Sequence, residues 1–341
     1  MHIQRVFVAS FALVLSVLAQ PAWAQVDFSG EWAPRFWEDQ PERVPGPDLG
    51  DYVGIPISDA ARLRGEAWDA SIQSLPDWQC RPHSADYIWR GPSNLRIWKE
   101  VDPVSREVAA FHAEWLRSVD RAIYLDGRPH PPEDALHTWG GFSTATWNGD
   151  VLTVTVTHLK EGYLRRNGLP RSDKATVTEH WVRHGDFLTV TTVINDPVYL
   201  TEPFVRSTDY ELDINQRIPP YPCGVVQEID RDEHHVPHYL PGTNPYTREF
   251  ATRERLPVEA TRGGAETMYP DFMQKLKTLS PPPLARASAP SAGARPAGAG
   301  RAGAAGRAAG AGPGPNGAAG RAAGTAPDPN GAAGRAGGTT R

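Results

Sequence analysis

Two polar residues lie on strand faces that are otherwise apolar, and their types suit proton transfer. In the Thr-rich strand expected over 151–159, aliphatic residues alternate with threonines, and this phase places His158 on the aliphatic face. If 151–159 pairs with a strand over 175–184, Glu179 lies on the same face as Trp181. An isolated buried charge is costly, so we expect the imidazole and the carboxylate to face each other or a shared ligand.

Such a pair would form an acid/base catalyst. Burial raises the pKa of a carboxylate and a neighbouring carboxylate raises that of a histidine, so both approach the working pH. We therefore predict that His158 and Glu179 are catalytic and that Trp181 belongs to the substrate-binding wall. The alternative is a His–Glu hydrogen bond that only satisfies polar groups in the core.

A second polar group follows the strand expected over 121–127. The segment LDGRPHPP supplies Asp126, Arg128 and His130, and His137 comes seven residues later. A guanidinium at this place would bind a carboxylate, and an imidazole would serve as acid or base. We predict catalytic roles for Asp126 and His130. Arg128 and His137 are predicted to bind substrate, and the alternative is a proline-stiffened turn with incidental polar residues.

Three further residues complete the predicted binding site. His112 shares a strand face with Glu114, and an exposed pair is the alternative there. Arg165 belongs to a basic loop over 160–174, which is either a lid that attracts an anionic ligand or a solvated loop. Trp139 is one of the ten tryptophans after residue 24, all of them before position 184. This aromatic density indicates a large core, a ligand cavity or both.

Motifs for metals and cofactors are missing from the sequence. The tight cluster His234, His235 and His238 contains Pro237, which excludes the helical i, i+4 spacing of many zinc enzymes. There is no P-loop, dinucleotide fingerprint, G-x-S-x-G elbow or haem-attaching C-x-x-C-H. We therefore predict no metal and no cofactor, with a small-molecule ligand as the partner.

The elements that must position these residues are mostly strands. Strand patterns separated by tight turns predict a mainly β fold, an antiparallel barrel or sandwich. One N-terminal helix is expected after Ser58, its predicted N-cap, with an apolar stripe formed by Leu63, Ala67, Trp68 and Ile72. A short helix is expected within 268–280. The strand patterns cover 95–101, 106–116, 121–127, 143–159 and 175–194.

Some of these patterns resemble known families. Gly30-x-Trp32, followed by antiparallel strands, resembles the lipocalin-type (calycin) β-barrel. The run from Ile123 to Pro203, with YLDGRPHPP, TWNGDVLTVTVT, RNGLPRSDKATVTEH and NDPVYLTEP, resembles a group of uncharacterised secreted proteins from soil bacteria. These resemblances imply a secreted lipocalin-like barrel and no particular activity. Members of that group often carry His-Ser where this chain has Arg171-Ser172, so no role is transferred to that position.

The two ends of the chain differ from its centre. A basic start, an apolar run over 6–18 and an Ala-Trp-Ala cleavage site predict a signal peptide over 1–24. The protein is then periplasmic or secreted, without a membrane span, and Cys80 and Cys223 are predicted to form a disulfide. A single β-barrel-type domain is expected over 25–280. The Ala/Gly/Pro/Arg-rich tail over 281–341 is expected to be disordered.

Charge separates the domain from the tail. The chain carries a net charge of −5, and seven arginines against one aspartate after position 280 leave roughly −11 on residues 1–280. An acidic domain disfavours nucleic acid as a partner. The basic tail predicts either a solvated extension or a weak contact with an anionic surface.

Taken together, the residues favour a cofactor-independent enzyme, a lyase or isomerase. It would act by His and carboxylate acid/base chemistry on a small, partly apolar organic molecule in a barrel pocket. One alternative is a non-catalytic lipocalin-like protein that binds such a molecule. Another is a carbohydrate-binding wall protein with coplanar tryptophans on an open face. An enzyme needs convergent titratable groups in its cavity, whereas a carrier needs an apolar cavity with few of them.

Overall fold

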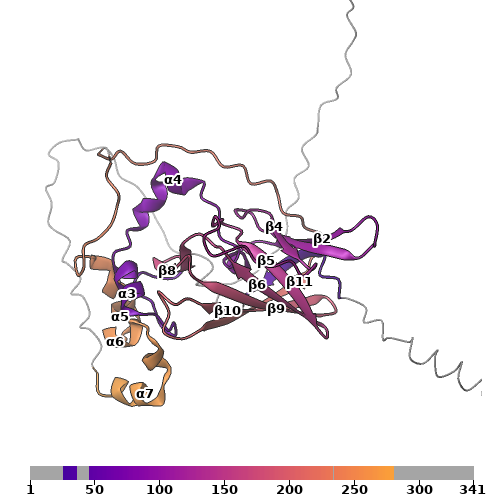
Figure 1. Cartoon of the computed structure of the whole chain (residues 1–341). Coiled ribbons are helices and arrows are strands. Elements are labelled where there is room, and N and C mark those ends of the chain that lie inside the picture. Colours follow the sequence, from indigo (N-terminus) through magenta and orange to yellow (C-terminus); the bar gives the residue numbers. More distant parts are fainter. Residues whose placement is uncertain (1–25, 37–45, 233, 280–341) are drawn as a thin grey trace, which may run out of the picture. The chain divides into compact units, whose positions relative to one another are not determined.

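The protein is mainly β, and its strands close into a nine-stranded barrel (Figure 1). The computed structural model describes residues 26–36, 46–232 and 234–279. The predicted signal peptide and the predicted disordered tail lie outside these residues. The barrel order is β1-β11-β10-β9-β6-β5-β4-β3-β2. The strands are β1 (Gly30–Arg35), β2 (Leu95–Val101), β3 (Val108–Glu114), β4 (Arg121–Tyr124), β5 (Phe142–Asn148), β6 (Val151–Thr157), β9 (Thr176–His184), β10 (Phe187–Asn195) and β11 (Phe204–Leu212).

The barrel is mixed, which corrects the purely antiparallel expectation. Eight of its neighbouring pairs are antiparallel, but β4 and β5 pair in parallel through Ile123↔Ser143 and Tyr124↔Thr144. A hairpin reverses the chain direction, whereas a parallel pair needs a crossover connection. The segment between β4 and β5 makes that crossover and carries two of the predicted site histidines, His130 and His137.

Two tight hairpins fix the register of the strands that follow them. Asn148 pairs with Val151 and His184 pairs with Phe187, so each turn has two residues. Gly149 and Gly185 open these turns with φ of +64° and +60°. Glycine adopts such left-handed angles without steric cost, and two-residue hairpin turns require them.

Side chains fill the inside of the barrel. The fully buried residues include Phe28, Trp32, Trp89, Phe111 and Trp181, together with aliphatic residues from most strands. The Phe28 ring meets both Phe111 and Trp181 edge to face, at centroid distances of 5.7 and 5.5 Å. The barrel is therefore a packed core, and the aromatic density of the sequence serves this core to a large extent.

The region expected as one N-terminal helix is divided into shorter pieces. The Ser58 side chain accepts a hydrogen bond from the Ala61 backbone N–H and caps α3, which ends at Glu66. The stripe proposed for this helix is wrong at Leu63, which is 54% exposed. The helical elements are α3 (Asp59–Glu66), η1 (Ala70–Ser74), α4 (Pro76–Gln79), η2 (Ile88–Arg90), η3 (Pro245–Arg248), α5 (Glu249–Glu254), α6 (Val258–Thr261), η4 (Ala265–Met268) and α7 (Pro270–Leu276).

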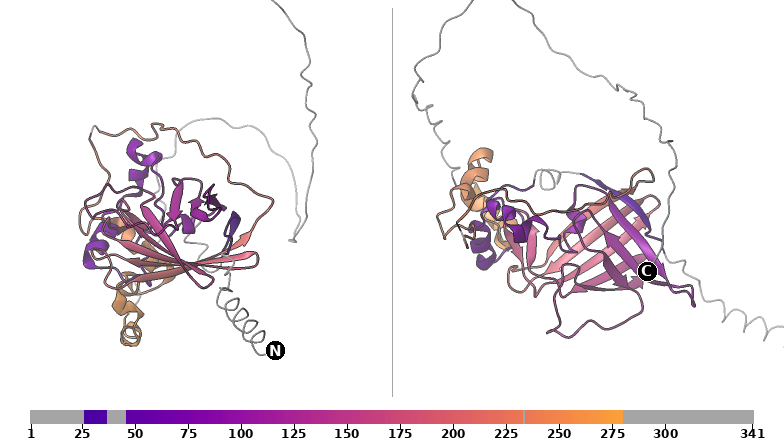
Figure 2. Two further views of the ribbon diagram at one scale, coloured as in Figure 1. Left: turned by 45° about the vertical axis from the view of Figure 1, so that its right-hand side comes forward. Right: turned by 90° about the horizontal axis from the view of Figure 1, so that it is seen from above.

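Most of these helices gather on one side of the barrel, as Figure 2 shows. Among the residues that the structure describes, none of the helices is long and apolar enough to cross a membrane.

The basic segment over 160–174 contains a second, separate sheet and is not simply a solvated loop. It forms the hairpin β7 (Gly162–Arg165) and β8 (Leu169–Arg171). Arg171 is fully buried and its Nε lies 3.0 Å from Asp86 Oδ2. Arg165 is also buried and pairs with Asp51 at 3.2 Å. These arginines anchor the hairpin by ion pairs, so they do not present free charge to solvent.

A segment without regular structure, the strap (residues 213–232 and 234–244), connects β11 to η3. In Figure 1 it passes α4 on its way towards α5. The predicted disulfide is present, with Cys80 and Cys223 joined at a Cα–Cα distance of 5.7 Å. The Gln79 side chain adds two hydrogen bonds to the Val226 backbone, at 2.6 and 2.7 Å. The strap is thus fastened beside α4.

Candidate functional site

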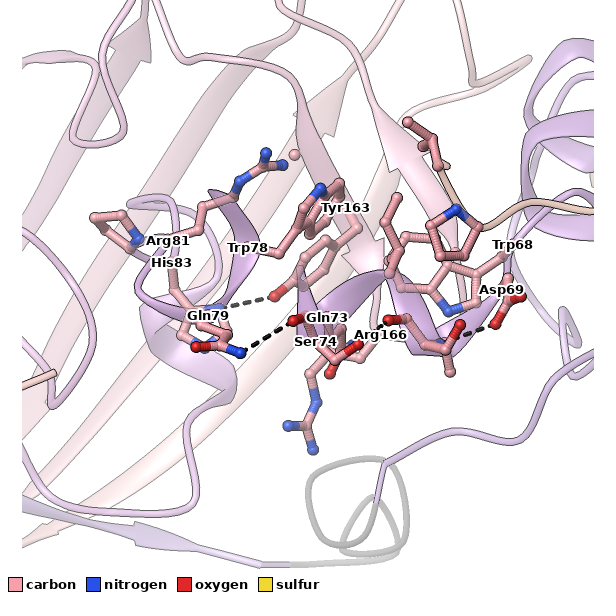
Figure 3. A pocket seen from close by; sticks show the side chains of 18 of the residues that line it. Trp68, Asp69, Gln73, Ser74, Trp78, Gln79, Arg81, His83, Tyr163 and Arg166 are labelled. Atoms are coloured by element: carbon pink, nitrogen blue, oxygen red, sulfur yellow. Dashed lines mark hydrogen bonds between the residues drawn. The ribbon is translucent and has the colours of Figure 1, made fainter. Parts of the chain in front are cut away.

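A cavity lies between η1 and α4, the β7–β8 hairpin and the strap (Figure 3). Its volume is about 970 Å³. The disulfide that fastens the strap contributes Cys223 to the wall. The aromatic part of the wall consists of Trp68, Trp78, Tyr87, Trp139 and Tyr163.

Arg81 is a charged residue of this wall that lies against two tryptophan rings. Its guanidinium carbon lies 3.6 Å from the centroid of the Trp78 ring and 5.5 Å from that of Trp139. Burial lowers the pKa of Arg81, because the charged guanidinium loses hydration there. Within the described part of the chain, no carboxylate forms an ion pair with it. The planar N–H donors of Arg81 therefore remain available to a ligand.

His83 and Tyr163 form a hydrogen-bonded pair in the same wall. Tyr163 Oη lies 2.9 Å from His83 Nδ1, and the His83 ring stacks on Tyr87 with a centroid distance of 4.9 Å. Burial, helped by the charges of Arg117 and Arg166, lowers the pKa of His83 to about 3. Burial also raises the pKa of Tyr163 well above its usual value. Both side chains are neutral at neutral pH. One of them donates the hydrogen bond that joins them, so the pair keeps one further N–H or O–H group that can donate to a ligand.

Sequence reasoning missed Trp78, Arg81, His83 and Tyr163. The first three flank Cys80, the residue whose disulfide pairing was predicted. A cluster of aromatic and basic residues around a disulfide cysteine was the signal that could have found them. Tyr163 carried no such signal, because it comes from a distant hairpin.

Glu179 points into the barrel as predicted, but its partners form a structural cluster. Both Arg121 terminal nitrogens donate to its carboxylate, at 2.9 and 3.1 Å. The indole N–H groups of Trp89 and Trp181 donate to the same carboxylate at 2.9 and 3.0 Å. Four hydrogen bonds satisfy the buried charge without a histidine. Trp181 is fully buried in this cluster and does not line the cavity.

The prediction that His158 points inward beside Glu179 is wrong. Strand β6 ends at Thr157, and His158 has a φ of +56°, in the left-handed region. This turn breaks the alternation, so Leu159 takes the next fully buried position. His158 Nε2 instead donates to the Pro132 carbonyl at 2.9 Å, and its Nδ1 lies 2.7 Å from Thr157 Oγ1.

Three predicted histidines do come together, but beside the β4–β5 crossover. His130 is held between the hydroxyls of Thr157 and Thr144, at 2.7 and 2.8 Å. The rings of His137 and His158 lie 5.2 Å apart. Burial, and then the charge of His158, lower the pKa of His130. The described residues contain no group of three or more His, Cys, Asp or Glu that could hold a metal ion.

The other predicted site residues lie apart from one another. Arg128 and Asp126 form an exposed pair at 2.5 Å within their turn. His112 lies 2.9 Å from Asp120 and 3.2 Å from Glu100, and its ring stacks on Trp98. Of all the residues predicted for the site, which the structure describes in full, Trp139 is the one that lines the large cavity. The assembled site is therefore different from the one that the sequence suggested.

Comparisons with known proteins add no functional information. No protein-family model, no curated protein and no solved structure matches this chain. The class of the molecule is set by its geometry: a mainly β protein with a filled, closed barrel and an aromatic-walled cavity beside it.

Proposed function

We propose that this protein binds a small, partly apolar organic molecule in the cavity between η1, α4, the β7–β8 hairpin and the strap. The observation that carries the proposal is the cavity itself, with a volume of about 970 Å³ and five Trp and Tyr side chains in its wall. Ligand pockets in proteins have volumes of roughly 300–1,000 Å³ and combine an apolar lining with a few polar groups. Arg81, His83 and Tyr163 are among the polar groups of this wall.

Binding is better supported than catalysis, because the titratable pair in the wall is poorly tuned for proton transfer. A general acid or base works best when its pKa lies near the operating pH. The pKa of His83 is lowered to about 3 and that of Tyr163 is raised, so both move away from neutrality. This supports the lipocalin-like carrier over the lyase or isomerase.

The acid/base enzyme remains a second candidate because of one observation. The 2.9 Å contact between Tyr163 and His83 places two proton-carrying groups together in the cavity wall. A carbohydrate-binding function has less support. Such a function needs coplanar rings on an open face, whereas the planes of Trp68 and Trp78 meet at 67°.

Export to the periplasm or the cell exterior is part of the proposal. Its support is the Cys80–Cys223 disulfide, since such bonds persist in oxidising compartments, together with the signal-peptide pattern of the first 24 residues. A carrier with this location would meet its ligand outside the cytoplasm.

A neutral apolar fluorophore tests the binding proposal. We expect N-phenyl-1-naphthylamine to bind the full chain saturably, with one site per molecule. Trp78→Ala and Trp139→Ala should each weaken its affinity about tenfold or more, because each removes a large apolar wall. Trp98→Ala is the matched control, since Trp98 stacks on His112 and does not line the cavity.

The outcome separates the candidates. Saturable binding that both cavity variants weaken, with far-UV circular dichroism unchanged, supports the carrier. Equal effects of all three variants, or no saturable binding, would overturn it. Mass spectrometry of a ligand recovered after incubation distinguishes the enzyme, since a carrier returns its ligand chemically unchanged.

A further inference from the structure

We propose that the ligand of the cavity is an aromatic carboxylate whose charge is held by Arg81; this rests on the binding function proposed above. The inference starts from the stacking of Arg81 on Trp78. The guanidinium carbon lies 3.6 Å from the ring centroid, and its N–H groups have no hydrogen-bond partner among the described residues. A guanidinium edge matches the two oxygens of a carboxylate in a bidentate pair.

The carboxylates of the wall form no ion pair with Arg81, and Asp77 raises the pKa of Arg81 only by a longer-range interaction that burial outweighs. Glu161 pairs with Arg64 across the wall. The Asp69 side chain accepts a hydrogen bond from the Ser71 backbone N–H at 2.9 Å, as the cap of η1. Glu228 of the strap is exposed to solvent. An anionic ligand would therefore meet a cation that has no ion-pair partner within the described residues.

The charges around His83 point to the same sign of ligand. Arg117 and Arg166 lie close enough to lower its pKa, and Arg81 acts on the neighbouring Tyr163. The other groups packed against His83 are the uncharged rings of Tyr87 and Trp115. Around His83 the charges are those of arginines and the packed rings are uncharged, so this part of the wall favours an anion over a neutral or cationic molecule.

The apolar part of the ligand follows from the rings. The ring centroids of Trp78 and Trp139 lie 3.6 and 5.5 Å from the guanidinium carbon of Arg81. Trp68 meets Trp78 edge to face at 5.7 Å. Figure 3 shows Trp68, Trp78 and Tyr163 along one stretch of the wall. A flat ring attached to a carboxylate fits this setting, because its face can pack on the indoles while its oxygens reach Arg81.

A matched pair of probes separates charge from shape. The probes are 2-naphthoate and its neutral analogue 2-naphthamide, titrated by calorimetry against the full chain, Arg81→Gln and Arg96→Gln. Arg96 is the control, since it also lies over a tryptophan, at 5.2 Å from the Trp98 centroid, but outside the cavity. We expect the wild-type protein to bind 2-naphthoate about 10- to 100-fold more tightly than 2-naphthamide.

Each variant has an expected effect on the preference for 2-naphthoate. Arg81→Gln should remove that preference and leave 2-naphthamide affinity within about twofold, while Arg96→Gln changes neither. Arg81→Lys, which keeps the charge but lacks the planar fork, should lose part of the preference. If Arg81→Gln does not fold, the inference is tested by the ratio of 2-naphthoate to 2-naphthamide affinity in the wild-type protein and in Arg81→Lys.

Failure of this inference is distinct from failure of the binding function. If the wild-type protein binds both probes equally and Arg81→Gln has no effect, the carboxylate inference is overturned and binding stands. If neither probe nor N-phenyl-1-naphthylamine binds, both are overturned.

Discussion

Replacing Glu179 by Gln tests whether the charged cluster inside the barrel is structural. The carboxylate accepts one Arg121 nitrogen and one indole N–H on each oxygen. A glutamine amide keeps one oxygen, but its NH₂ group would face N–H donors that can no longer be satisfied. Arg121, whose side chain is 1% exposed, would also lose its counter-charge.

The size of the effect follows from this burial. Removing one partner of a buried ion pair costs about 3–5 kcal/mol, because the remaining charge is uncompensated. The indole hydrogen bonds belong to the same cluster, so their energies are not added separately. A loss of this size is a large part of the roughly 5–15 kcal/mol that stabilises a typical domain.

The assay is equilibrium unfolding in urea, followed by tryptophan fluorescence. Glu211→Gln is the matched control, since Glu211 forms a pair with Arg35 in which both side chains are more than 40% exposed. We expect that control to cost about 0–1 kcal/mol. Replacing both Arg121 by Met and Glu179 by Leu should cost less than Glu179→Gln alone, because no unpaired charge remains.

The reasoning is refuted if Glu179→Gln lowers the unfolding free energy by no more than Glu211→Gln does. The folded fraction of Glu179→Gln should bind N-phenyl-1-naphthylamine with wild-type affinity, because Glu179 does not line the cavity. A selective loss of binding in a stable protein would instead show that the cluster serves the site.

Other perturbations test the cavity wall, the disulfide and the histidines outside the cavity. Burial lowers the pKa of His83 to about 3, so its neutral form stabilises the fold above pH 6.5 and this contribution is lost as pH falls towards 3. NMR of the His83 ring should therefore show no titration between about pH 5 and 8, and a titration near pH 6.5 would contradict the burial argument. For His112, burial lowers the pKa but hydrogen bonds to two carboxylates outweigh it, so the pKa is raised. Its stabilisation is present below pH 6.5 and is lost as pH rises through the raised pKa, which the same NMR titration measures. Replacing Cys80 and Cys223 by Ser removes a cross-link between residues 143 positions apart and should lower the unfolding free energy, measured in urea, by up to about 5 kcal/mol. Two free thiols in the unfolded, unreduced wild-type protein would show that the disulfide does not form. His158→Asn should keep the melting temperature within about 3 °C and leave probe binding unchanged, because Asn tolerates the left-handed backbone conformation. A loss of probe binding would show that His158 contributes to the binding site.

The sequence by itself determined the local features of the sheet. Period-two alternation and Gly turns predicted the β5–β6 and β9–β10 hairpins and the pairing of β6 with β9. The same alternation placed Glu179 inside, where it lies opposite Val154. The parity of the cysteines predicted the disulfide. These features were readable because strand phase and turn geometry depend on neighbouring residues.

Only the tertiary structure decided which polar groups meet. Strand phase fails at His158, because one left-handed residue beyond the strand end redirects the chain. Glu179 finds its counter-charge in Arg121, 58 residues away. His83 meets Tyr163 from a hairpin 80 residues further along. Contacts at such separations depend on how whole elements pack, so the residues around Cys80 could be singled out from the sequence but their partners across the cavity could not.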